Sequence, residues 1–324
     1  MRCVRASSPA RSTSTRRTVH YLLGPPRVSA GRERSDTGAD VFERAVAMRE
    51  ASRRWRRDGK SIGLVPTMGA LHAGHLRLVD VARRENDVVV TSVFVNPIQF
   101  GPHEDLDRYP RDWDRDLRLL NEAEVDAVYR PSVEEMYPPD ASTRVRVDGL
   151  AESLEGSARP GHFEGVATVV TKLLAAVEPD RAYFGQKDAQ QVAVVRRLVR
   201  DLDLGVDIRA VPTVREPDGL ALSSRNVYLN PEERKAAASL SAALRQATAA
   251  YAEGERDTER LRAILYGRLG AEPLVKIDYA ELVDPATFRK SGTLAVIAAR
   301  VGKTRLIDNH DVSKSWPGTS PHLR

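Results

Sequence analysis

Two patterns of apolar and polar residues alternate along most of the chain: short, nearly continuous apolar runs, and longer segments with apolar residues at helical spacing. The apolar runs predict buried strands at 62–66, 87–95, 127–129, 144–147, 179–184 and 207–214. The other segments predict helices at 40–58, 74–86, 113–124 and 166–177, and one opened by residues 185–191. Strands and helices in this order predict an α/β fold with a Rossmann-like, doubly wound parallel sheet.

The pattern changes after residues 215–219. Asn230 followed by Pro231 predicts the start of a long Ala-rich helix, 231–252. A further helix and three strands are predicted at 257–269, 275–282, 293–300 and 304–308. We therefore expect a Rossmann-like domain at 39–214, a second, smaller α+β C-terminal domain at 215–312, and disordered ends at 1–38 and 313–324.

The formal net charge of +5 comes from the N-terminal segment. Residues 1–35 hold eight arginines against one acid, Glu33, so the rest of the chain carries a net charge of −2. This balance argues against a nucleic-acid partner, which would favour a basic face on the folded part. The segment resembles an organellar targeting peptide in composition, but a start outside the native protein is the favoured interpretation.

Two further features limit the class of protein. No apolar run approaches the roughly 18 residues of a membrane helix, so no membrane partner is expected. The single cysteine, Cys3, excludes an internal disulfide and is consistent with a reducing compartment, so a cytoplasmic location is predicted.

Candidate chemistry begins at residues 63–76, where an apolar run leads into a Pro-Thr-Met-Gly turn and then a helical pattern. A strand, tight loop and helix start place free backbone N–H groups and a positive helix end together, which favours a bound anion such as a phosphate. His72 and His75 are three residues apart and share a face of this helix. Both imidazoles are candidate hydrogen-bond donors to phosphate oxygens.

Two other segments supply similar donors. Lys187 lies at the start of a predicted helix, and Ser223, Ser224 and Arg225 form a loop at the start of the second domain. The carboxyl ends of parallel strands bring the first two groups of donors to one crevice. The third group is consistent with a lid that closes over a nucleotide.

Neutral amides add a second kind of contact. Asn96 and Gln99 follow a buried strand, and Gln191 lies near Lys187. The acids of 104–116 are expected to form a solvated face, with a lesser chance of reaching a metal ion. Neither a His/Cys cluster nor a Gly-x-Gly-x-x-Gly or P-loop motif occurs. The pattern predicts a site that holds a triphosphate against a small polar substrate without a covalent nucleophile.

The segment 66–75 (PTMGALHAGH) resembles the HIGH motif of the nucleotidylyltransferase superfamily and, within it, the pantothenate synthetase (pantoate–β-alanine ligase) family. Four further motifs resemble the same family, in its order and spacing: 94–100 (FVNPIQF), 104–111 (EDLDRYPR), 184–191 (FGQKDAQQ) and 223–229 (SSRNVYL). The resemblance runs from about residue 40 to 310. It implies that ATP activates pantoate as pantoyl adenylate with release of pyrophosphate, and that β-alanine then displaces AMP to give pantothenate.

The resemblance also implies residue roles. His75, His72, Lys187 and Arg225 are the expected catalytic residues, with His75 as the candidate proton donor to the transition state. Gln99 and Gln191 are expected to bind pantoate, Gln99 also β-alanine, with Asn96 as a helper and Asp188 as acceptor for a ribose hydroxyl. The expected ATP-binding residues are Met68, Gly69, Ala70, Leu71, His72, Ala73, Gly74, His75, Gly185, Gln186, Lys187, Asp188, Val214, Leu222, Ser223, Ser224 and Arg225. Mg²⁺ is expected mainly through ATP oxygens, with Asp116 as a possible contact, and a homodimer is implied.

Three alternatives stay open at this stage. Another HIGH-motif nucleotidylyltransferase would join a phosphate to a nucleotide and stop. A tRNA synthetase shares the HIGH motif, but the charge of the body and the lack of room for an anticodon domain argue against it. A non-catalytic nucleotide-binding module remains if the histidines are structural.

Overall fold

The computed structural model describes residues 38–102 and 104–317, so nearly all of the predicted extension 1–38 lies outside the described residues. The main sheet has six parallel strands in the spatial order β1-β4-β3-β2-β5-β6. Their bounds are β1 (Asp40–Phe42), β2 (Ile62–Thr67), β3 (Val88–Val93), β4 (Ala127–Tyr129), β5 (Arg181–Gly185) and β6 (Asp207–Val211).

The central strands are buried on both faces, which explains their continuous apolar runs. Leu64 of β2 and Val90 of β3 belong to the core on one face of the sheet. Their neighbours Val65 and Val89 belong to the core on the other. Successive side chains of a strand point to opposite faces, so an apolar run contributes side chains to the cores on both faces.

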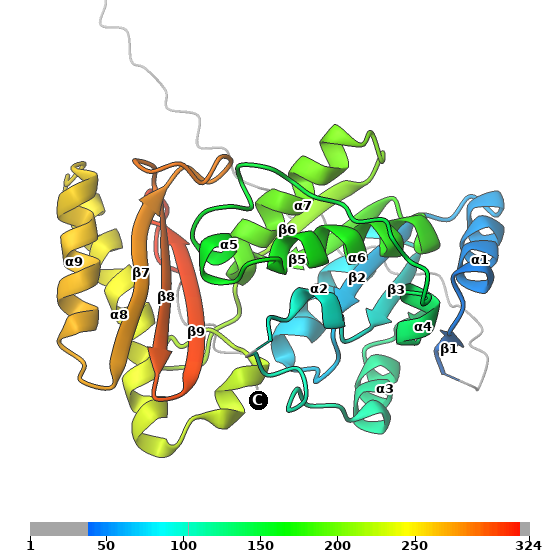
Figure 1. Ribbon diagram of the computed structural model, residues 1–324, viewed down its shortest axis with the longest axis horizontal. Helices are drawn as coiled ribbons and strands as arrows, with labels where there is room; N and C mark the ends of the chain where they lie inside the picture. Colours follow the sequence, from blue (N-terminus) through cyan, green and yellow to red (C-terminus); the bar gives the residue numbers. More distant parts are fainter. Residues whose placement is uncertain (1–37, 103, 318–324) are drawn as a thin grey trace, which may run out of the picture. The chain divides into compact units, whose positions relative to one another are not determined.

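Helices cover both faces of this sheet (Figure 1). One face carries α6, which packs against both α1 and α7, while α2 packs against β2, β3 and β5. The helices are α1 (Ala45–Arg57), α2 (Ala73–Glu85), α3 (Trp113–Glu122), α4 (Val133–Met136), α5 (Glu155–Ala158), α6 (His162–Val177) and α7 (Ala189–Asp201), with 3₁₀ turns η1 (Pro97–Gln99), η2 (Gln186–Asp188) and η3 (Ser224–Tyr228). The predicted α/β, doubly wound class is confirmed.

The strand order reverses between β2 and β5. From β2 the chain builds outward through β3 and β4, whereas β5 pairs with the other edge of β2, with Gly63 beside Arg181. Open α/β sheets bind ligands outside the carboxyl ends of strands at such a switch point. The loops after Thr67 and Gly185 are therefore expected to form a ligand-binding site.

The second, antiparallel sheet follows after η3. Its strands are β7 (Val275–Val283), β8 (Leu294–Val301) and β9 (Thr304–Asp311), and α8 (Pro231–Ala252) and α9 (Thr258–Gly270) cover one face of it (Figure 1). The predicted start of α8 is confirmed: Asn230 caps Glu233 N–H while the Glu233 carboxylate caps Asn230 N–H. This sheet and its two helices form the smaller α+β part that the sequence predicts.

The start of one predicted helix is wrong, and one predicted strand does not form. Residues 40–42 form β1, parallel to β4, and the helix begins only at Ala45; pairing with a strand far along the chain overrides the local helical pattern. The strand predicted at 144–147 does not form. Val145 N–H instead donates to the Thr168 hydroxyl of α6, so this segment satisfies its backbone on a helix.

Part of the predicted C-terminal tail lies within the described residues. Of the predicted tail 313–324, residues 313–317 are described. The Trp316 ring lies under the Arg215 guanidinium, with 4.7 Å from Cζ of Arg215 to the ring centroid.

Among the helices of the described residues, none combines the length and the apolar character that a membrane span needs.

Candidate active site

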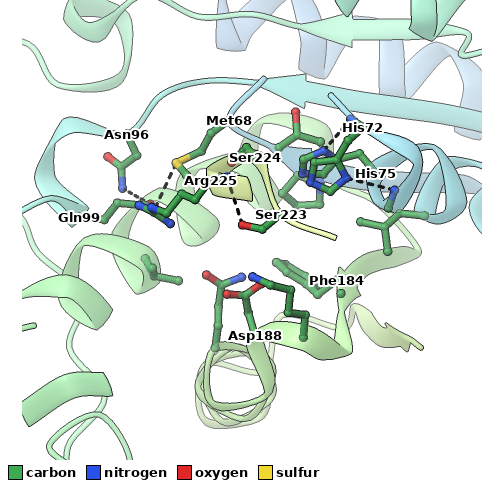
Figure 2. A pocket seen from close by; sticks show the side chains of 18 of the residues that line it. Met68, His72, His75, Asn96, Gln99, Phe184, Asp188, Ser223, Ser224 and Arg225 are labelled. Carbon is green, nitrogen blue, oxygen red and sulfur yellow. Dashed lines mark hydrogen bonds between the residues drawn. The ribbon is translucent and has the colours of Figure 1, made fainter. Parts of the chain in front are cut away.

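A cavity of about 230 Å³ lies at the switch point, at the carboxyl ends of β2 and β5. It gathers predicted residues from four separate motifs, and Figure 2 shows the histidines, the amides and the Ser-Ser-Arg turn around one space. The predicted residues that line it are Met68, His72, Gly74, His75, Asn96, Gln99, Gly185, Lys187, Asp188, Gln191, Val214, Leu222, Ser223, Ser224 and Arg225.

Six predicted residues do not line this cavity: Gly69, Ala70, Leu71, Ala73, Asp116 and Gln186. Asp116 is 2% exposed, and its two carboxylate oxygens accept the backbone N–H groups of Ala70 and Leu71, each at 2.8 Å. It therefore fixes the loop that leads to the histidines, at a point where Ala70 has a φ of +49°. Its predicted contact with magnesium stays a prediction.

His72 and His75 cap the start of α2 together. Nδ1 of His72 accepts from Gly74 N–H at 3.1 Å, and Nδ1 of His75 accepts from His72 N–H at 3.4 Å. A backbone N–H can only donate, so each neutral imidazole carries its proton on Nε2. The rings are stacked with centroids 4.1 Å apart (Figure 2). The cap thus leaves both histidines with an Nε2–H donor.

Both imidazoles are neutral at physiological pH. Burial, followed by the charge of Lys187, lowers the pKa of His72 to about 4. Burial, His72 and Lys187 together lower the pKa of His75 to about 3. Neutral rings can still donate hydrogen bonds, but they add no charge. The positive potential of the cavity must come from Lys187, from Arg159 and Arg225, and from the amino end of α2.

Lys187 lies in η2, directly after β5. Asn309 of β9 donates from its side-chain amide to the carbonyl oxygens of Gln186 at 3.0 Å and Lys187 at 2.7 Å. Asn309 is 5% exposed, so this contact is shielded from water. The second sheet therefore holds the turn that carries the lysine.

Arg225 is the second residue of η3, and its backbone N–H donates to the hydroxyl of the N-cap residue Ser223 at 3.3 Å. The Arg225 guanidinium makes two hydrogen bonds with the Asp105 carboxylate, at 3.0 and 2.9 Å. The turn thus directs one guanidinium and two hydroxyls, of Ser223 and Ser224, at the cavity.

Asn96 and Gln99 form an ordered pair after β3. The Asn96 amide donates to Gln99 Oε1 at 3.0 Å and to the Gly165 carbonyl at 3.1 Å, and Tyr137 donates to Asn96 Oδ1 at 2.8 Å. Gln99 Oε1 is thus occupied, and Gln99 Nε2 donates to Met68 Sδ at 3.2 Å, so only its second N–H is available to a ligand. A Cβ on Gly165 would lie 2.6 Å from the Ile98 carbonyl, so only glycine lets α6 approach this turn so closely.

The sequence interpretation missed Arg159 and His162, which also line the cavity. Arg159 Nη1 lies 3.0 Å from His162 Nε2, and His162 Nδ1 lies 2.9 Å from the Gln99 carbonyl. Since arginine only donates, His162 accepts at Nε2 and donates from Nδ1. For His162 the signal was the glycine-flanked segment 161–165, directly before the predicted helix 166–177.

We expect the free energy of unfolding to fall between pH 7 and pH 5. His162 is 8% exposed; burial, and then Arg159, lowers its pKa to about 4. The unfolded imidazole, with a pKa near 6.5, binds more protons in this range, so acid favours unfolding. Urea denaturation of His162→Gln should show a fall smaller by about 1–2 kcal/mol. An equal fall in both proteins would contradict this assignment.

The side chains that line the cavity suit a metal ion that enters already bound to phosphate groups. Asp188 is the one carboxylate among the residues that line the cavity. Within 38–102 and 104–317, no three His, Cys, Asp or Glu side chains gather into a potential metal site. Mg²⁺ bound to phosphates keeps several waters and needs few protein ligands.

Comparison with known proteins gives a consistent result. The family model for pantoate–β-alanine ligase matches residues 40–311. The pantothenate synthetase of Chloroflexus aurantiacus is 59% identical over 254 residues, covering 76% of this chain and 90% of the relative. That of Thermotoga petrophila is 54% identical over 274 residues, covering 83% and 98%.

Solved structures agree with these relatives. The pantothenate synthetase of Thermus thermophilus superposes with a TM-score of 0.80 at 50% identity, covering 84% of this chain and 99% of that one. A pantoate–β-alanine ligase of Francisella tularensis, solved with β,γ-ATP and β-alanine, has a TM-score of 0.72 at 34% identity and covers 86% and 99%. With its fold, its five motifs and these matches, the chain belongs to the pantoate–β-alanine ligase family of enzymes.

Proposed function

We propose that the chain joins pantoate to β-alanine at the expense of ATP through a pantoyl adenylate, and releases pyrophosphate and AMP. One observation carries the proposal: neutral imidazole donors, three cations and three side-chain amides surround one cavity at the switch point. Family membership supports the same overall reaction. ATP and β-alanine in the Francisella structure support the substrate class.

In the first step a pantoate carboxylate oxygen forms a bond to the α-phosphorus of ATP, and the bond to pyrophosphate breaks. Two anions must approach, so catalysis consists of positioning and charge stabilisation. Lys187 and Arg225 offset the charge of the triphosphate, with hydroxyls of Ser223 and Ser224 beside them. His72 and His75 donate hydrogen bonds from Nε2 to phosphate oxygens. Their neutral state favours hydrogen bonding over transfer of a proton by His75.

Backbone groups near Met68, Gly185 and Val214 are proposed to surround the adenosine, and Asp188 to accept from the ribose. Magnesium is proposed to enter on the phosphate oxygens. When bound, it would neutralise charge on the triphosphate.

In the second step the β-alanine amine forms the amide bond to the carbonyl carbon, the bond to AMP breaks, and the amine loses a proton. Gln99 and Gln191 are proposed to hold pantoate, and Gln99 also to orient β-alanine. Asn96 and Met68 fix the Gln99 amide, which leaves one Nε2–H group for the ligand. An amine with a pKa near 10 is mostly protonated at neutral pH, so the reactivity of the acyl adenylate must compensate.

The assembly proposed is a cytoplasmic homodimer in which residues 215–312 act as a lid over 39–214. The contacts of Arg225 with Asp105 and of Asn309 with the η2 turn support the lid, because both join the C-terminal part to the nucleotide side of the cavity.

The products test the reaction. We expect purified enzyme to form AMP, pyrophosphate and pantothenate in equal amounts, and only when ATP, pantoate and β-alanine are all present. Chromatographic quantification of the three products would measure this. Release of pyrophosphate without AMP would instead indicate the alternative, a nucleotidylyltransferase that leaves the nucleotide joined to its substrate.

A further inference from the structure

Two consecutive acidic residues form ion pairs with two arginines that line the cavity. Glu104 and Asp105 lie in the loop between η1 and α3. Glu104 pairs with Arg159 at 2.9 and 2.5 Å, and Asp105 pairs with Arg225 at 3.0 and 2.9 Å. Both arginines line the cavity, whereas neither acid does. The carboxylates therefore approach the guanidinium groups from the side away from the ligand space.

The contact with Asp105 leaves one edge of Arg225 available. The hydrogen bonds run from Nε to Oδ2 and from Nη2 to Oδ1. A planar guanidinium has a second edge, formed by Nη1 and the other hydrogen of Nη2. This second edge can pair with two phosphate oxygens without breaking the ion pair. The geometry is that of a residue held in place, with its binding edge left open.

The loop and η3 are joined at a further point. Tyr228 of η3 donates to the Arg108 carbonyl at 3.1 Å, 120 residues away along the chain. The side chain of Asp105 is 15% exposed and that of Arg225 29% exposed, so the pair is shielded from much of the solvent. Burial alone would raise the pKa of Asp105, but the Arg225 guanidinium lowers it below its ordinary value. The carboxylate is thus charged when it meets the arginine.

We infer that Asp105 is a positioning residue for the adenylation step: it fixes the Arg225 guanidinium so that its free edge faces the β- and γ-phosphates of ATP. This inference rests on the proposed function of the cavity. The opposite role would be competition, in which Asp105 occupies Arg225 until the phosphates displace it. The two roles predict changes of opposite sign in the affinity for ATP.

The first test is Asp105→Asn. An asparagine of similar size keeps one acceptor, but its NH₂ faces a guanidinium donor, so the two-point hold is lost. We expect the KM for ATP and the Kd for ATP from calorimetry each to rise about tenfold. The KM values for pantoate and β-alanine should stay within about twofold. Asp107→Asn is the matched control, since it removes the same charge from an exposed position of the same loop.

Two further variants separate positioning from a general effect of charge. Asp105→Glu keeps the charge but moves it by one methylene, and should raise the KM for ATP by less than Asp105→Asn does. It also serves if Asp105→Asn does not fold. In a double-mutant cycle, Asp105→Asn should add little to Arg225→Ala, because Asp105 acts only through Arg225.

Each outcome decides the inference. A lower KM for ATP in Asp105→Asn would support competition and overturn it, as would an unchanged KM or equal effects of Asp105→Asn and Asp107→Asn. The calorimetric Kd needs no turnover, so it separates this inference from the proposed function. A wild-type enzyme that binds ATP but forms no AMP would overturn the function and leave the comparison of Kd values intact.

Discussion

Alanine in place of either Lys187 or His75 is expected to lower turnover by at least about a hundredfold, the scale of losing one preorganised donor to a charged transition state. Lys187 is expected to supply charge and His75 a hydrogen bond from Nε2, so each loss leaves a negative oxygen less well stabilised. Pantothenate formation under saturating substrates would measure the effect. Circular dichroism and thermal unfolding would show that both variants remain folded.

Lys172→Ala is the control for charge. Lys172 is exposed on α6 and does not line the cavity, so its loss should leave turnover unchanged. Turnover within a few-fold of wild type in folded Lys187→Ala or His75→Ala would refute the role given to that residue.

Replacing Arg215 with methionine is expected to destabilise the fold by about 3–5 kcal/mol, the usual cost of leaving a buried charge without its partner. Arg215 donates to Asp308 at 2.6 and 2.9 Å, and their side chains are 9% and 1% exposed. Methionine would keep much of the apolar stem but strand the Asp308 carboxylate. Urea denaturation, with the slope checked for two-state behaviour, would measure the loss.

Two variants frame this result. Arg200→Met breaks an exposed pair with Asp201, with side chains 67% and 49% exposed, and should change stability by no more than about 0.5 kcal/mol. The double variant Arg215→Met/Asp308→Leu removes both charges and should recover most of the loss. A loss below about 1 kcal/mol in Arg215→Met would show that Asp308 finds other compensation.

Much of the fold follows from local pattern. Strands buried on both faces are largely apolar, so β2 and β3 are evident in the sequence although β3 also buries Thr91 and Ser92. The start of α8 is evident too, because Asn230 and Glu233 cap it within one turn. The strand at 40–42 is not evident, because its cause is pairing with residues 127–129. Short elements such as α5 have too few residues for any periodicity to show.

For the candidate site too, local sequence patterns reveal some features and not others. Motifs identify residues such as His72 and Lys187, because helix starts and strand ends have local signatures. They cannot identify which acid meets which arginine: Asp105 and Arg225 are 120 residues apart, and Glu104 and Arg159 are 55 apart. Nor does sequence reveal that the two histidines accept backbone N–H groups at Nδ1, which decides where their protons lie.

The contact of Asn309 with the η2 turn has a consequence for how such a protein can evolve. The carbonyl oxygens of Gln186 and Lys187 are held by a strand of the other sheet. Selection that preserves the position of Lys187 is therefore expected to act on β9, although Asn309 lies outside the lining of the cavity. A recombination event that replaced residues after 230 with an unrelated partner would sever this hold, so the two sheets are expected to be inherited together.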